Sequence, residues 1–78
     1  KIISKKDLET GIKLLELLVD NKIMNSKSEA RRAINNKGIK INDLLVDNEN
    51  KILNFLDFKD KNMKISFGKK KHFLFKIT

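Results

Sequence analysis

The sequence predicts an α+β fold, in which two packed helices are followed by a small, mostly antiparallel, twisted sheet. Two observations point to it. The first half of the chain carries apolar residues at helical spacing, and the second half carries short segments in which apolar and polar residues alternate. The chain has 78 residues and no proline, which fits one small domain without a rigid linker.

The first helix is predicted over residues 11–21. Residues 1–10 are polar and show no clear period, so we interpret them as a linker or N-terminal extension that precedes a domain spanning 11–78. Within the helix, apolar residues cover most of the circumference, and only a narrow polar stripe that includes Lys13 interrupts them. We therefore expect this helix to be mostly buried.

The second helix is marked by a start signal and a stop signal. Ser26 and Glu29 have the spacing of a capping box, in which each side chain accepts a hydrogen bond from a free backbone N–H at the helix start. Residues 36–38, Asn-Lys-Gly, are typical of a helix end. The residues on the predicted buried side are Ala30, Ala33 and Ile34. Because the alanines are small, this helix can pack closely on the first.

The rest of the chain is predicted to form short strands. They cover residues 39–42, 44–46, 63–67 and 73–77, with a tight turn at Asn42-Asp43 and a hairpin tip at 68–71. Residues 52–58 are apolar, but their period fits either a strand or one helical turn, and both remain open. The five phenylalanines fall among alternating polar residues, so we expect them in the core.

The positive charge of the chain is concentrated in two blocks. The formal net charge is +8. Residues 22–40 carry +5 and residues 61–78 carry +6, whereas 41–60 carry −3 and 1–21 are neutral. If the fold brings the two basic blocks together, they form a localised surface that attracts an anionic partner. The alternative is a lysine-rich surface that serves only solubility.

Composition excludes several classes of site. The chain has no cysteine and one histidine, His72, so neither a disulfide framework nor a zinc site is expected. No apolar run is long enough to span a membrane, and we expect neither membrane contact nor a small-molecule substrate. No nucleotide-binding motif, nucleophile–base pair or carboxylate dyad is evident, which predicts a non-catalytic chain. A chain without cysteine is compatible with the reducing cytoplasm, where we expect it.

The second helix and the strand after it are predicted to present a basic surface. Ser28, Arg31, Arg32 and Asn35 fall opposite the buried side, and no acidic residue shares their arc. On the strand, Lys40 points away from the core. Arginine can hold a phosphate through two hydrogen bonds, whereas lysine acts as a mobile point charge. This pattern favours binding to a folded polyphosphate backbone over a merely solvated helix face.

These residues carry a family resemblance. The run from Ser26 to Ile34, with residues 37–42 after it, resembles the alpha-L RNA-binding motif, the ribosomal-protein-S-four-like domain. Residues 67–74, Phe-Gly-Lys-Lys-Lys-His-Phe-Leu, are similar to the closing hairpin of the C-terminal domain of bacterial tyrosyl-tRNA synthetases. The resemblance covers roughly residues 12–78. Many relatives have Asn-Gly where this chain has Asn42-Asp43, which leaves the turn geometry open.

The resemblance implies a function for the chain. It implies that the parent protein is an ATP-dependent tyrosine–tRNA ligase and a homodimer, with ATP and magnesium confined to a separate catalytic domain and no cofactor in this chain. It also implies that this chain holds tRNA at its long variable arm and the adjacent stem. The contacts implied are Lys27, Ser28, Arg31, Arg32, Asn35, Lys37, Lys40, Lys69, Lys70 and Lys71.

Two other functions remain open from the residues. The helix motif is shared with ribosomal-RNA pseudouridine synthases and small ribosome-associated factors, so the chain could bind ribosomal RNA. A DNA-binding helix-turn-helix is less favoured, because a strand follows the second helix at once and no third helix is visible. Because Lys1 and not methionine comes first, we expect the chain to be a piece of a longer protein.

Overall fold

The computed structural model describes all residues from 1 to 78. Its elements are β1 (Ile2–Ile3), α1 (Lys5–Thr10), β2 (Ile12–Lys13), α2 (Leu14–Asp20), α3 (Lys27–Asn35), β3 (Ile39–Ile41), β4 (Leu44–Leu45), β5 (Ile52–Leu53), the 3₁₀ turn η1 (Phe55–Asp57), β6 (Asn62–Phe67) and β7 (Lys71–Ile77). The α+β class predicted from the sequence is confirmed.

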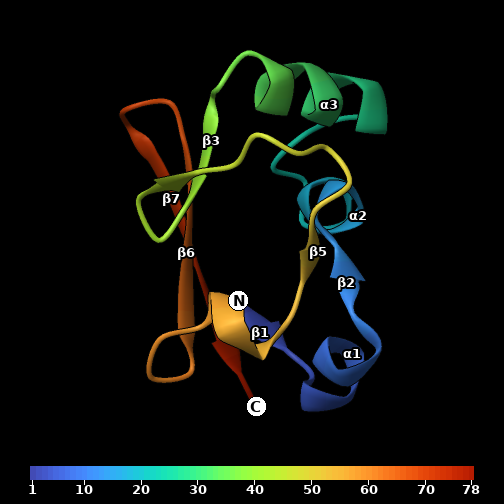
Figure 1. The fold of residues 1–78 in the computed structure, drawn as a ribbon, viewed down its shortest axis with the longest axis vertical. Helices are drawn as coiled ribbons and strands as arrows, with labels where there is room; N and C mark the ends of the chain where they lie inside the picture. The colour runs from blue at the N-terminus through green and yellow to red at the C-terminus, as the bar shows by residue number, and fades with distance from the viewer.

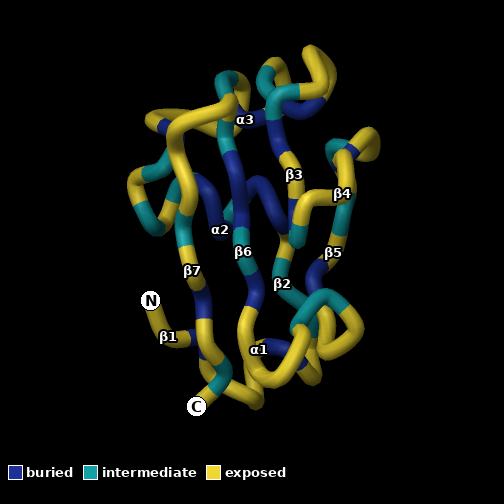
Figure 2. Tube along the Cα trace, turned by 90° about the vertical axis from the view of Figure 1, so that its left-hand side faces the viewer, coloured by how far each residue is buried: buried dark blue, intermediate teal, exposed yellow.

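The strands form a larger and a smaller sheet. Five strands pair in the order β1-β7-β6-β3-β4, and β2 pairs with β5 in a separate two-stranded sheet. Every pair is antiparallel except β1 with β7, which is parallel. All three helices lie on one side of the five-stranded sheet (Figure 1), and Figure 2 shows the other side of that sheet facing outward without a covering layer.

The core lies between the covered face of the five-stranded sheet and the helices. Alternation in β3, β6 and β7 turns Ile39, Ile65 and Phe75 toward the helices, and all three side chains are fully buried. From the helices, Leu18 and Ile34 are buried against them in the same cluster. This burial fixes α3, because it leaves only one face of that helix for solvent.

Residues 1–10, for which a linker or N-terminal extension was expected, form short elements of their own. They contain β1 and α1, and they contribute Ile3 and Leu8 to the core. In β1, Ile2 pairs with Lys76 of the last strand, a contact between opposite ends of the chain that no local pattern reveals. A two-residue strand and a six-residue helix are also too short to show a hydrophobic period.

The first predicted helix begins later than expected. Residues 12–13 form β2, and α2 starts only at Leu14. The break occurs because Gly11 has a positive φ of 94°, a conformation outside any helix, and because the Leu14 N–H donates to the Lys51 carbonyl oxygen over 3.0 Å. The buried character of this segment is confirmed, since four leucines of α2 are buried.

Helix α3 starts and ends where the sequence predicts, although the details of its C-terminus differ. The Glu29 backbone N–H donates to the Ser26 Oγ over 3.2 Å, which confirms the N-cap. At the other end, the Gly38 N–H donates to the Ala33 carbonyl oxygen and the Lys37 N–H to the Ile34 carbonyl oxygen, the pattern of a Schellman motif. The left-handed residue is Lys37, with φ 61°, rather than Gly38.

Gly38 serves a different purpose. A Cβ at this position would lie 3.2 Å from the Ala33 carbonyl oxygen and 3.6 Å from the Phe67 ring. The tight contact is therefore with the last turn of α3 itself, whereas the Phe67 ring of β6 would lie at an ordinary van der Waals distance.

The turn at Asn42-Asp43 is a tight hairpin turn. Both residues have positive φ, 51° and 69°, and the flanking register pairs Ile41 with Leu44, as in a two-residue type I′ turn. Aspartate therefore adopts the left-handed conformation that glycine adopts most easily. The Asp43 carboxylate Oδ1 accepts from Lys64 Nζ at 2.9 Å, which helps to hold it there.

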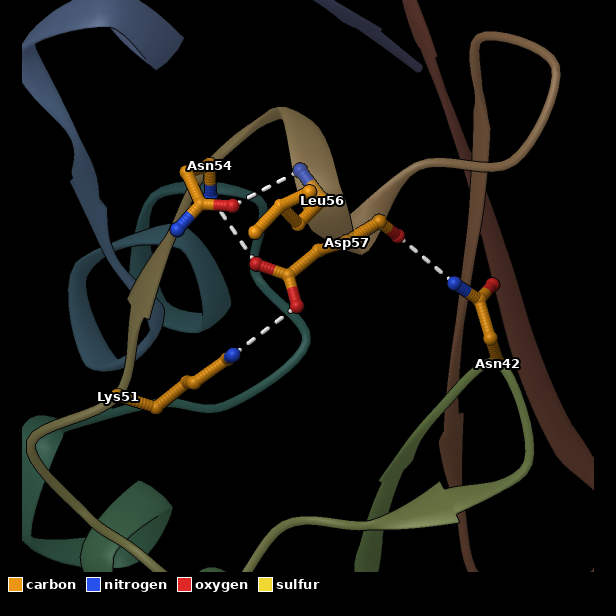
Figure 3. A network of polar contacts seen from close by, with 5 residues as sticks. All are labelled: Asn42, Lys51, Asn54, Leu56 and Asp57. Atoms are coloured by element: carbon orange, nitrogen blue, oxygen red, sulfur yellow. Dashed lines mark hydrogen bonds and ion pairs between the residues drawn. The ribbon is translucent and has the colours of Figure 1, made fainter.

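Residues 52–58 form both of the structures that the sequence left open. A strand, β5, is followed at once by the turn η1, and Figure 3 shows the polar contacts that hold this turn. The Leu56 N–H donates to the Asn54 Oδ1 over 2.8 Å, and the Asn54 N–H donates to the Asp57 Oδ2 over 3.0 Å. These reciprocal bonds make a capping box that ends the strand.

No helix is both long enough and apolar enough to cross a membrane.

Candidate nucleic-acid interface

The outward face of α3 carries two arginines without partners. Arg31 and Arg32 are exposed, and neither forms an ion pair. They point outward because Ala30 and Ile34, on the opposite side, are fully buried. Ser28 is also exposed and makes no hydrogen bond through its side chain. The outward orientation predicted from helical periodicity is confirmed for these residues.

The arc occupied by the arginines is not free of acids, which corrects the expectation from sequence. The Asn35 Nδ2 donates to the Glu49 Oε2 over 3.2 Å, and Lys27 Nζ lies 3.8 Å from the Glu16 Oε1. Both acids come from other segments of the chain, and only the fold brings them to α3. Lys27 and Asn35 therefore have intramolecular partners, whereas the arginines do not.

The two basic blocks of the sequence meet at the end of α3. The Gly68 N–H donates to the Gly38 carbonyl oxygen over 3.1 Å, and β3 pairs with β6 so that Lys40 lies opposite Ser66. Figure 1 shows the C-terminal end of α3 and the β6–β7 hairpin tip together at the top of the molecule. Positions separated by thirty residues in the sequence thus become neighbours.

The hairpin tip is exposed, and its lysines are close to this junction. Lys69 and Lys70 form the turn after Gly68, while Lys71 begins β7. Lys71 Nζ lies 5.7 Å from the centre of the Phe67 ring, within the range of a cation–π contact. We call the following set the basic ridge: Lys27, Ser28, Arg31, Arg32, Asn35, Lys37, Lys40, Lys69, Lys70 and Lys71.

The uncovered sheet face next to the ridge carries residues that sequence reasoning did not select. Ser66 lies between Lys40 and His72 in the register, and its Oγ is 3.0 Å from the His72 Nδ1. His72 is exposed. Lys64 shares this face. The alternation of β6 and β7 could have indicated which residues share this face, but nothing in the sequence indicated that the face is uncovered.

Asp43 is placed among these cations. A hydrogen bond from Lys64, followed by the positive charge of the same lysine, lowers the pKa of the Asp43 carboxyl below its ordinary value. Lys40 and His72 contribute smaller effects in the same direction. An acidic side chain therefore lies within the basic surface of this sheet face, at the turn after β3.

A pocket beside the N-terminal half of α3 gathers four cations, of which Lys27 and Arg31 also belong to the basic ridge. It has a volume of about 230 Å³ and lies between the start of α2, the N-terminal half of α3 and the segment before β5. Its basic residues are Lys13, Lys27, Arg31 and Lys51. Neither Lys13 nor Lys51 was predicted as a site residue, because only the pairing of β2 with β5 brings them to α3.

Comparison with known proteins matches nearly the whole fold to one family. Residues 3–75 match the family described as the tyrosine–tRNA ligase SYY-like C-terminal domain. The chain belongs to this family. The resemblance that the helix and hairpin motifs indicated is therefore confirmed. The matched range includes Ile3 of β1 and all of α1, which fits the packing of both elements in the common core.

Curated relatives support the assignment. The chain is 44% identical over 77 residues to the tyrosine–tRNA ligase of Rickettsia felis, and 42% identical over 77 residues to that of Rickettsia bellii. It is 44% identical over 72 residues to the tyrosine–tRNA ligase of Wolbachia pipientis wMel. These matches cover 97%, 97% and 91% of this domain. The domain spans only 19%, 19% and 17% of the relatives' lengths.

Proposed function

We propose that this domain binds tRNA for a tyrosine–tRNA ligase, with the basic ridge as its contact surface. The observation that carries the proposal is the hydrogen bond from the Gly68 N–H to the Gly38 carbonyl oxygen. It brings the helix and hairpin parts of the ridge next to each other on a rigid junction. A continuous basic surface can follow a folded phosphate backbone, which two distant patches could not do.

The unpaired arginines support the same function. Arg31 and Arg32 have no internal carboxylate to neutralise them, so a phosphate can bind without first displacing an intramolecular ion pair. Because α3 is fixed by its N-cap and by buried Ala30, the two guanidinium groups project from a rigid element. A preorganised surface loses less conformational entropy on binding.

The wider assignment is part of the proposal. The relatives are about five times as long as this domain, since it spans 19% of the Rickettsia felis protein. We propose that tyrosine activation, with its ATP and magnesium, belongs to another domain of the parent enzyme, and that the parent is a cytoplasmic homodimer. The domain itself then acts without a cofactor and holds the long variable arm and adjacent stem of the tRNA.

The test is a salt titration of tRNA binding by fluorescence anisotropy. A tRNA with a long variable arm should bind with an affinity that falls steeply with salt, with a log–log slope of several units if about five phosphates are neutralised. The double variant Arg31→Ala/Arg32→Ala should bind more weakly and show a shallower slope.

A matched control removes the same charge elsewhere. Lys5 and Lys6 lie on α1, at the opposite end of the molecule from α3 in Figure 1. The variant Lys5→Ala/Lys6→Ala should bind nearly as tightly as the unmodified domain. A nearly flat salt dependence, or equal losses in both double variants, would refute binding through the ridge. Tighter binding to ribosomal RNA than to this tRNA would instead favour a ribosomal function.

A further inference from the structure

The pocket beside α3 has a charge imbalance that its own residues do not correct. Of its two acids, Glu16 lies 3.8 Å from Lys27, and Glu49 accepts a hydrogen bond from the Asn35 amide. Lys13 and Arg31 form no ion pair, although both line the same pocket. Two cations from different elements therefore face one small volume in which Glu49, whose partner is a neutral amide, is the one acid left to balance them.

The fourth cation of the pocket is neutralised from outside it. Lys51 Nζ lies 2.9 Å from the Asp57 Oδ1, and Asp57 belongs to the capping box of η1. Figure 3 shows that the Asp57 carbonyl oxygen is held in turn by the Asn42 side chain. This chain of contacts fixes the wall of the pocket that contains Lys51, and it leaves Arg31 without an acidic partner.

The backbone holds Lys13 in place relative to the same wall. Lys13 pairs with Ile52 in the two-stranded sheet, and the next residue, Leu14, donates its N–H to the Lys51 carbonyl oxygen over 3.0 Å. Because Lys13 is exposed and its side chain caps nothing, its ammonium group is available to a ligand. Arg31 approaches the pocket from α3, which is fixed independently.

We propose that this pocket binds one backbone phosphate of the bound RNA, with Lys13 and Arg31 as its two charge partners. The inference rests on the proposed function and extends its contact surface around α3, away from the hairpin tip. Arg31 supplies a planar fork of donors that fits two phosphate oxygens, and Lys13 supplies a point charge on the opposite wall. The RNA then spans both sides of the outward helix face.

The first test is a comparison of Lys13→Ala with Lys6→Ala in RNA affinity. Each variant loses one exposed lysine, but Lys6 lies on α1, which contributes no residue to the pocket. Lys13→Ala should weaken binding about five- to tenfold and reduce the salt slope by about 0.7 to 0.9. Lys6→Ala should change neither quantity measurably. Lys13→Arg should restore the slope because it restores the charge.

A second test locates the phosphate on the RNA. Each backbone linkage in the protected region is replaced in turn by an uncharged methylphosphonate. At one linkage, the unmodified domain and Lys13→Ala should bind equally, because the contact is already lost. If the penalty of Lys13→Ala persists at every linkage, Lys13 acts only through the general field and the pocket assignment is wrong. Titration with inorganic phosphate alone should leave the Lys13 and Arg31 resonances unshifted; saturation at low concentration would indicate a free-phosphate site instead.

The two proposals fail in different ways. If Lys13→Ala matches Lys6→Ala while Arg31→Ala/Arg32→Ala binds weakly, the pocket proposal is overturned and the ridge stands. If the arginine variant also binds normally, the proposed function itself is overturned. A further variant tests the pocket directly. Glu16→Gln removes an acid that lines the pocket and should tighten RNA binding.

Discussion

The Asn42 side chain joins two turns that are fifteen residues apart. Its Nδ2 donates to the Asp57 carbonyl oxygen over 2.7 Å, and its Oδ1 accepts from the Lys64 backbone N–H at 2.9 Å. At the same time its backbone occupies the left-handed region, with φ 51°. One residue thus forms the hairpin turn after β3, anchors η1, as Figure 3 shows, and ties both to β6 through the Lys64 N–H.

Substitutions of Asn42 should separate these contributions. Asn42→Gly keeps the positive φ and loses both side-chain hydrogen bonds, so it should cost about 1–3 kcal/mol of unfolding free energy. Asn42→Ala loses the same bonds and also places a Cβ in the left-handed region, which should add about 1 kcal/mol. Urea denaturation of both variants measures the difference. Equal stability of the two would show that the backbone conformation at Asn42 carries no strain.

The Asp43–Lys64 ion pair should make stability depend on acid. The pKa of Asp43 is lower in the folded chain than its ordinary value of 3.8, which it regains on unfolding. The stabilisation is therefore fully present above that ordinary value and is lost as the pH falls through the lower, folded pKa. A carbon-13 NMR titration of the Asp43 carboxyl measures the shift directly.

Two lysine variants provide an ordered control for this titration. Lys64→Met removes the hydrogen bond and the nearest charge, so the Asp43 pKa should rise toward its ordinary value. Lys40→Met removes a weaker influence and should raise it less. The reverse order would contradict the ion pair at 2.9 Å.

Ser26 should stabilise α3 through its cap alone. Ser26→Ala removes the acceptor for the Glu29 N–H and should cost about 1 kcal/mol in chemical denaturation. Ser28→Ala is the matched control, because Ser28 is exposed on the same helix and caps nothing. It should change stability by less than about 0.5 kcal/mol. Similar losses in both variants would argue against the cap.

The ridge should protect one continuous part of the RNA. Arg31→Ala/Arg32→Ala and the triple alanine variant at 69–71 should each weaken tRNA binding, since an Arg–phosphate contact contributes about 1–3 kcal/mol. Chemical footprinting should show both variants losing protection at adjacent nucleotides. Normal binding by the hairpin variant, or lost protection at distant nucleotides, would rule out a single surface.

Local signals predicted those elements of the fold whose causes lie within a few residues. The cap at Ser26, the outward turn of Arg31 and the alternation that buries Ile65 all follow from adjacent residues and regular geometry. The parallel pairing of Ile2 with Lys76 does not, because both partners lie at opposite ends of the sequence. For a related reason β2 was assigned to a helix, since its partner strand β5 lies far from it along the chain.

The candidate site likewise contains residues that the sequence predicted and residues that it did not. The helix and hairpin residues of the ridge were selected from the sequence, and their exposure followed from periodicity. Lys13 was placed on a polar stripe with no role, since nothing near it in the sequence indicates that Lys51 and Arg31 face the same pocket. The acids Glu16 and Glu49 were missed as partners of α3 for the same reason.

The contact between Gly38 and Gly68 has a thermodynamic consequence. Because the hydrogen bond between these glycines joins segments thirty residues apart, the unfolded chain holds the charges of the helix and the hairpin at varying separations. A ligand that touches both segments at once must therefore prefer the folded chain. By linkage, such a ligand raises the midpoint of thermal unfolding in proportion to the logarithm of its concentration. The melting temperature of this domain should therefore rise with any ligand that contacts the helix and the hairpin at the same time.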